Sequence, residues 1–101
     1  MEIISTENYD ATIASGLVVV DFFANWCGPC RMVGPVLEKL AGQMTDVKFV
    51  KVDVDASMPV AARYGIQSIP AILVFKDGEL VDSQVGFTGE GPIKAMISKH
   101  M

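Results

Sequence analysis

Residues 17–30 read LVVVDFFANWCGPC, and this stretch decides the fold expected for the chain. Its first half, residues 17–23, is a short run of β-branched and aromatic residues, which is typical of a buried strand. The run is too short to span a bilayer, which takes about 20 apolar residues, and Asp21 interrupts it. Its second half ends in Cys27 and Cys30, where a long helical pattern begins. The stretch predicts a strand that delivers two thiols to the start of a helix.

Further strands and helices are expected to alternate along the rest of the chain. The additional candidate strands lie at residues 3–4, 47–53, 72–75 and 80–85. The sequence KDGE at 76–79 predicts a hairpin turn, so the last two strands should be antiparallel. The helical patterns cover residues 6–15, 27–44, 58–64 and 92–101. The alternation indicates an α/β fold.

Local signals refine these helices. In the long helix an apolar face is expected from Met32, Val33, Val36, Leu37 and Leu40. Ser57 is suited to cap the third helix, and Gly65 is expected just past its end. Gly91 followed by Pro92 suits the start of the last helix.

Length and composition narrow the class of protein. The chain has 101 residues, half of them apolar, and no linker or repeat divides it, so we expect a single domain over residues 1–101. Its 8 basic and 12 acidic side chains give a net charge of −4 without a basic cluster, which argues against nucleic acid as a partner. The first ten residues show no export signal. We expect a cytoplasmic protein that does not bind a membrane.

Cys27 and Cys30 carry the predicted chemistry. Two cysteines separated by two residues cannot make a secreted disulfide framework and fit intracellular thiol chemistry better. Unpaired N–H groups and the dipole at a helix N-terminus favour a thiolate, and they lower the pKa of Cys27 below the free value of about 8.5. We therefore expect Cys27 to be the nucleophile. Cys30, inside the first turn, should be less exposed and suits the resolving role.

Two other uses of these cysteines compete with redox chemistry. A pair spaced C-x-x-C is often half of a zinc site, but structural zinc takes four ligands and His100 is the only other usual soft ligand. We therefore expect no metal. A purely structural disulfide between Cys27 and Cys30 would close a loop too small to restrict the unfolded chain much.

At this point the sequence resembles the thioredoxin family over nearly its whole length. The landmarks, in the family's order and spacing, are VDF at 20–22, WCGPCR at 26–31, Pro35, KVD at 51–53, IP at 69–70, FKDG at 75–78 and VG at 85–86. The resemblance implies a thioredoxin fold, a central five-stranded mixed sheet flanked by four helices. It also implies protein disulfide reduction without a bound cofactor. Nothing in the sequence argues for an obligate oligomer, so we expect a monomer. The redox-active disulfide Cys27–Cys30 would be reduced again by thioredoxin reductase, an NADPH-dependent flavin enzyme.

Asp21 and Lys51 are the candidate catalytic residues besides the thiols. A carboxylate inside an apolar strand incurs a desolvation cost unless it is paired or protonated, although an outward-facing Asp21 would avoid that cost. The resemblance implies that Asp21 is buried behind Cys30 and accepts its proton through water. Lys51 is implied as the charge partner of Asp21, while strand periodicity alone would place it in solvent.

The resemblance also implies a substrate surface. In the family the matching Ile69–Pro70 bond is cis and leaves the backbone of Ile69 free to pair with extended substrate. From the residues alone, Pro70 would simply begin a strand, and Trp26 would serve equally as a packing residue. The remaining members of the expected substrate surface are Trp26, Gly28, Pro29, Gly86 and Phe87. Several positions depart from the commonest family pattern, namely Phe23, Arg31, Ala71 and Phe87. Phe87 bears on partner choice because it is bulkier than the usual residue.

Other functions share this chemistry or this fold. A thiol oxidant or disulfide isomerase would use the same C-x-x-C pair, but the dipeptide Gly28-Pro29 matches the reducing members of the family. A binding subunit of the same fold would not need its thiols. Asp53 and Asp55, alternate residues at a strand end, are assigned no catalytic role.

Overall fold

The computed structural model describes residues 1–101 and contains nine secondary-structure elements. In chain order they are β1 (Glu2–Ile3), α1 (Thr6–Ile13), β2 (Leu17–Phe23), α2 (Cys30–Gln43), β3 (Lys48–Asp53), α3 (Met58–Arg63), β4 (Ala71–Lys76), β5 (Glu79–Val85) and α4 (Glu90–Ser98). The expected α/β fold, with a five-stranded mixed sheet and four helices, is confirmed. None of the helices combines the length and the apolar character needed to cross a membrane.

The sheet has the strand order β1-β3-β2-β4-β5, which places β2 at its centre. β1, β3 and β2 run parallel, whereas β4 and β5 are antiparallel to their neighbours, as the predicted hairpin required. Asp77 and Gly78 form the hairpin turn between β4 and β5, with φ values of 50° and 86°. This left-handed conformation is characteristic of tight two-residue hairpins.

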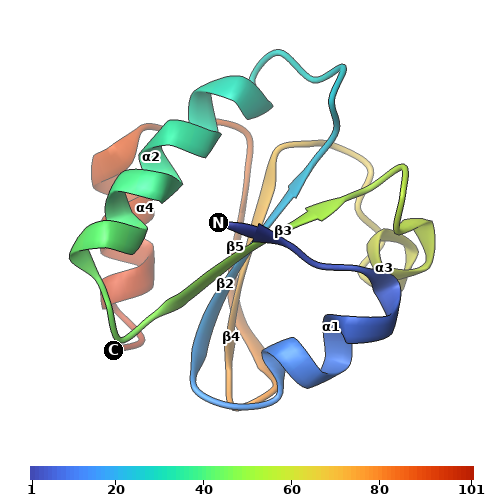
Figure 1. Cartoon of the computed structure of the whole chain (residues 1–101). Helices are drawn as coiled ribbons and strands as arrows, with labels where there is room; N and C mark the ends of the chain where they lie inside the picture. Colours follow the sequence, from blue (N-terminus) through green and yellow to red (C-terminus); the bar gives the residue numbers. More distant parts are fainter.

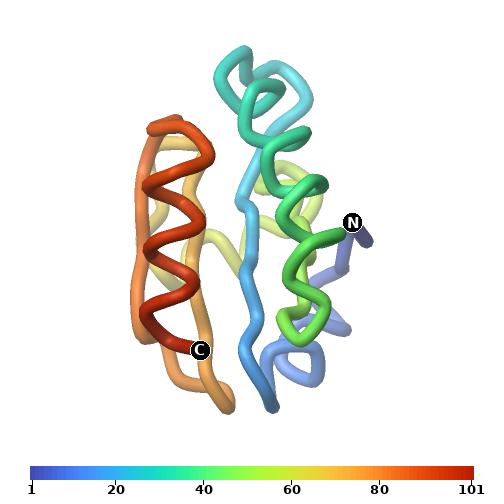
Figure 2. Tube along the Cα trace, turned by 90° about the vertical axis from the view of Figure 1, so that its left-hand side faces the viewer, coloured from blue at the N-terminus to red at the C-terminus, as the bar shows by residue number.

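Helices cover both faces of the sheet. Figures 1 and 2 show α2 and α4 on one face, and Figure 1 shows α1 and α3 on the other. Because successive strand side chains point to opposite faces, β2 contributes to both cores. Val18, Val20 and Phe22 lie in the core that includes Tyr9 of α1, and Val19 lies in the core with α2 and α4.

Several helix boundaries and side-chain positions differ from the sequence predictions. α2 begins at Cys30 rather than near Cys27, because Gly28 and Pro29 form a turn ahead of it. α4 begins at Glu90, two residues before Pro92, which a helix tolerates in its first turn. Ser57 occupies the N-cap position of α3, but its side chain makes no capping hydrogen bond. Met32 was wrongly assigned to the apolar face of α2, since it is 55% exposed.

The two faces of α2 should differ in their contribution to stability. Leu37 is fully buried, so Leu37→Ala removes packed atoms and leaves a cavity, which costs about 2–5 kcal/mol of unfolding free energy. Met32→Ala on the same helix is the matched control and should cost no more than about 0.5 kcal/mol. Denaturant unfolding at constant m-value measures both changes. A similar loss in the two variants would contradict this assignment of the α2 faces.

Candidate functional site

The two cysteines lie between the end of β2 and the first turn of α2. The backbone N–H of Cys27 donates to the carbonyl of Ala24 at 3.1 Å and closes the turn that leaves the strand. Cys27 and Cys30 form a disulfide with a Cα–Cα distance of 5.3 Å. The backbone N–H of Cys30 points to Cys27 Sγ at 3.2 Å. The start of α2 therefore presents a hydrogen-bond donor to this sulfur.

Both cysteines are buried in the disulfide form. Phe23 and Ala24 pack around them, with Val54 and Ile69 at the edge of the same cluster. Cys27 is 4% exposed and Cys30 is 7% exposed. The expectation that Cys30 would be the less exposed of the two was therefore wrong, because this cluster covers the residue before the helix as fully as the residue that begins it.

Asp21 is fully buried in the middle of β2. Neither of its carboxylate oxygens has a hydrogen-bond partner. Burial raises the pKa of Asp21 to about 6, and the attraction of Lys51 only partly opposes this rise. Neighbouring side chains of a strand point to opposite faces of the sheet, and Phe22 points into the core on the α1 side. Asp21 therefore points to the face that α2 covers, as Val19 does. The outward-facing alternative for Asp21 is thereby excluded.

Lys51 lies beside Asp21, its partner in the parallel register of β2 and β3. Its Nζ lies 4.3 Å from the centroid of the Phe23 ring, a distance typical of a cation–π interaction. A hollow of about 640 Å³ is lined by Lys51, Cys30 and Arg31 among others. Lys51 therefore faces the cysteine side of the sheet and is only half-buried there.

The peptide bond between Ile69 and Pro70 is cis. Ile69 packs against the cysteine cluster, and Pro70 is buried. The backbone N–H of Gly86 donates to the Pro70 carbonyl at 2.8 Å, and Gly86 has a φ of 86°, which favours glycine. The structure therefore brings Ile69, Pro70 and Gly86 together near the thiols. Phe87 is half-buried and packs toward the core under α2 and α4.

Trp26 is 70% exposed, which excludes the alternative that it is a packing residue. Its indole Nε1 donates to Asp55 Oδ2 at 2.9 Å. Gly28 and Pro29 are also exposed, so they adjoin Trp26 on the outer surface of the turn. Asp53 Oδ1 accepts hydrogen bonds from the backbone N–H groups of Asp55 and Ala56.

Asp55 was missed as a site residue. The sequence did carry one signal for its position: it follows β3, and the ends of the parallel strands β2 and β3 lie at the same edge of the sheet. Nothing in the sequence showed that its carboxylate would hold the indole of Trp26.

The zinc alternative lacks its remaining ligands. No group of three or more His, Cys, Asp or Glu side chains is arranged to hold a metal ion. His100 lies near Leu17, at the opposite end of β2 from Cys27. Its Nε2 contacts Asp82 Oδ2 at 2.9 Å, and His100 and Lys99 together lower the pKa of Asp82 to about 2.

Comparison with known proteins agrees with this geometry. The thioredoxin family model matches residues 1–99. The chain is 47% identical over 100 residues to a thioredoxin of Chlamydia trachomatis, covering 99% of this chain and 98% of that protein. It is 45% identical over 96 residues to a thioredoxin of Bacillus subtilis, covering 94% and 92%.

A solved structure gives the same result for the fold. The structure of Plasmodium falciparum thioredoxin superposes with a TM-score of 0.93 at 37% sequence identity, and the match covers 100% of both chains. The sequence, the fold and the disulfide at the start of α2 all indicate the same family. A cysteine pair of this kind exchanges electrons without a bound cofactor. The chain therefore belongs to the thioredoxin family, whose members are thiol–disulfide oxidoreductases that reduce protein disulfides.

Proposed function

We propose that Cys27 is the attacking thiol and Cys30 the resolving thiol in the reduction of protein disulfides. The Cys27 thiolate bonds to one substrate sulfur, and the other substrate sulfur leaves as a thiolate. Cys30 then attacks Cys27 and releases the second substrate sulfur. The substrate gains two electrons, and the protein is left with the Cys27–Cys30 disulfide.

The observation that carries this assignment is the contact between the Cys30 backbone N–H and Cys27 Sγ at 3.2 Å. A donor aimed at the sulfur favours its negative form and therefore its role as nucleophile. Cys30 has the position within the first turn that lets its sulfur reach the Cys27–substrate bond.

We further propose that Asp21 accepts the proton that Cys30 must lose before it attacks. A base works best when its pKa lies near the operating pH, and burial brings that of Asp21 to about 6. The hollow beside Cys30 and Lys51 has room for water that would carry the proton. Lys51, next to Asp21 in the sheet register, would stabilise the resulting carboxylate.

The proposed substrate surface lies around the thiols. Trp26, Gly28 and Pro29 are exposed on the turn, and Ile69 and Pro70 lie on the neighbouring segment. The backbone of Ile69 would pair with an extended substrate chain. Gly86 would leave room for that chain, and Phe87 at its border would affect the choice of partner.

We place this chemistry in the cytoplasm, in a monomer that works as a single domain over residues 1–101. The family implies disulfide-containing protein substrates and a reductase partner. We propose that this partner is an NADPH-dependent flavin enzyme, thioredoxin reductase, which returns two electrons to the Cys27–Cys30 disulfide.

Trapping distinguishes the two cysteines. Cys30→Ser keeps the attacking thiol but cannot release it, so this variant should accumulate a covalent adduct with a disulfide-containing protein such as insulin. Cys27→Ser is the matched control and should form little or no adduct. Non-reducing electrophoresis or mass spectrometry measures the adducts. Equal trapping by both variants would contradict the assigned order, and full activity without either cysteine would favour a binding subunit instead.

Asp21→Asn should change the pH dependence of stability. The folded-state pKa of Asp21 is raised from 3.8 to about 6, so the native state holds the proton more tightly than the unfolded state. Between these values stability falls as pH rises. One pKa unit corresponds to about 1.4 kcal/mol, so the free energy of unfolding of the parent should fall by up to about 3 kcal/mol across this pH window. The Asn side chain in Asp21→Asn cannot ionise, so this variant should not show the loss. Below about pH 4 the difference in unfolding free energy between the parent and the variant should vanish.

Denaturant unfolding at a series of pH values measures this effect. Asp46→Asn, which removes an exposed carboxylate, is the control and should follow the parent. If Asp21→Asn lost as much stability as the parent between about pH 4 and 6, another group would be responsible.

Asp21→Asn should also slow the second step of the reaction. Single-turnover release of substrate from the Cys27 adduct should be slower in this variant, because general-base catalysis typically contributes about 10²–10⁴-fold. In the parent the release rate should rise as pH passes through about 6. An unchanged release rate in Asp21→Asn would leave Cys30 with a different proton acceptor.

A further inference from the structure

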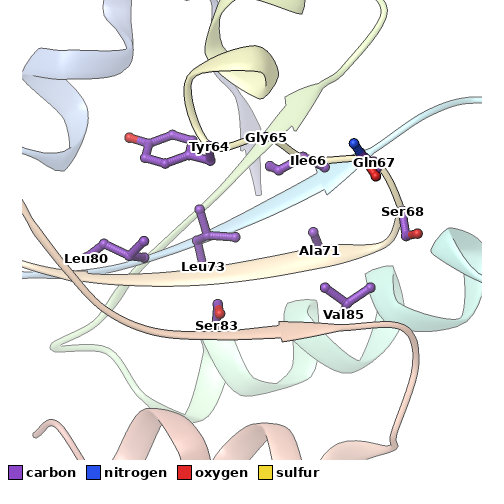
Figure 3. Close-up of a pocket in the computed structure, with 10 residues that line it drawn as sticks. All are labelled: Tyr64, Gly65, Ile66, Gln67, Ser68, Ala71, Leu73, Leu80, Ser83 and Val85. Carbon is purple, nitrogen blue, oxygen red and sulfur yellow. The ribbon is translucent and has the colours of Figure 1, made fainter.

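A groove of about 300 Å³ lies between residues 64–68 and β5, over part of β4 (Figure 3). Ala71 and Leu73 of β4 form its floor, and Ser83 and Val85 of β5 lie along one side (Figure 3). Tyr64 and Ile66 lie along the other side. None of its ten lining residues is charged, although charged residues make up 20% of the chain. The groove is therefore a mostly apolar surface feature.

Part of the apolar lining is open to solvent. Leu80 is 45% exposed and Val85 is 61% exposed, and no lining residue belongs to a helix. The Tyr64 wall is held in place by the core, because its ring packs edge-on against Phe75 with the centroids 5.7 Å apart. Contiguous exposed apolar residues mark interaction sites on soluble proteins.

One end of the groove adjoins the residues next to the thiols. Ser68 lines the groove, and the following residue, Ile69, packs against the cluster that contains Cys27 and Cys30. Val85 also lines it, and the next residue, Gly86, donates its N–H to the Pro70 carbonyl. The groove therefore begins where the proposed substrate clamp ends.

We propose that the groove binds an apolar side chain of the substrate protein, carried by the extended segment next to the disulfide under attack. This inference rests on the proposed clamp at Ile69 and Pro70. Extended chain spans about 3.3–3.6 Å per residue, so the side chain would lie about two to four residues from the attacked cysteine. The uncharged lining would exclude a charged side chain, which would lose its hydration without gaining a partner.

The size of the groove agrees with this occupant. A volume of about 300 Å³ lies at the lower end of small-molecule sites, and it suits one or two amino-acid side chains better than a cofactor. Burial of one leucine side chain favours binding by about tenfold or more. The groove would thus select among disulfides by the sequence around them.

Peptides with a single cysteine, disulfide-linked to 2-mercaptoethanol, test the groove. They carry leucine or aspartate at one position, two to four residues before or after the cysteine. At one of these positions, on one side of the cysteine only, the reduced parent should favour leucine. Its kcat/KM for the leucine peptide should be about tenfold higher than for the matching aspartate peptide. Leu80→Asp should lose this preference. Ile3→Asp, which adds the same charge at the other edge of the sheet, should keep it.

Controls separate docking from thiol chemistry. All three proteins should reduce hydroxyethyl disulfide at the same rate, because this small compound does not reach the groove. Leu80→Ser is a milder change without a charge and should lower the preference as well. Circular dichroism and denaturant unfolding verify that each variant is folded.

Four results would overturn the proposal. They are the absence of a leucine preference in the parent at every position, an unchanged preference in both Leu80 variants, and a slower reaction of both variants with hydroxyethyl disulfide. The fourth is sedimentation of the parent as a dimer and of Leu80→Asp as a monomer, which would assign the groove to a second copy of the chain. A Cys30→Ser variant that traps none of the peptides would instead contradict the proposed function itself.

Discussion

The pairing of β2 with a strand on each side is the constraint on which the rest of the structure depends. β2 pairs with β3 in parallel and with β4 in antiparallel orientation, so its backbone groups have a neighbouring strand on both sides. Its side chains enter the cores on both faces. The chain then leaves the sheet after Phe23, and the turn that follows holds Cys27 just ahead of Cys30, the first residue of α2. The position of the thiols therefore depends on the position of this central strand.

The fold was predictable because local signals agreed with one another. The three valines of β2 indicated a buried strand, and Asp77-Gly78 indicated the hairpin. The boundaries were harder to predict, since a helix start depends on how the preceding turn closes. The helical pattern around Cys27 continued into Gly28 and Pro29, but in the structure these two residues form a turn ahead of α2. Their carbonyls only accept the first hydrogen bonds, from the backbone N–H groups of residues 31–33.

The candidate site was predictable only in part. Cys27 and Cys30 could be inferred from the motif, whereas the burial of Asp21 was implied by the family resemblance and not fixed by its place in an apolar strand. The hydrogen bond from the Trp26 indole to the Asp55 carboxylate could not be inferred, because the two residues are 29 positions apart and meet only at the edge of the folded sheet. Lys51 shows a related limit. Its register with Asp21 follows from parallel pairing, but the position of its ammonium over Phe23 depends on side-chain packing.

The edge strand β5 lines an exposed apolar groove, and its features disfavour pairing of its backbone with a strand of another chain. An exposed edge strand is a template for association with another chain, and proteins protect such edges with charges, bulges and cover. β5 carries Asp82, which is held by Lys99 and His100 at the end of the chain. Its pairing with β4 shifts register between Val74 and Phe75. Such an irregularity twists and bends an edge and disfavours continuous pairing. These features protect the backbone edge of β5 and leave the side chains of Leu80 and Val85 accessible on its face, so the surface beside the thiols can accept single side chains of a partner more readily than a whole added strand.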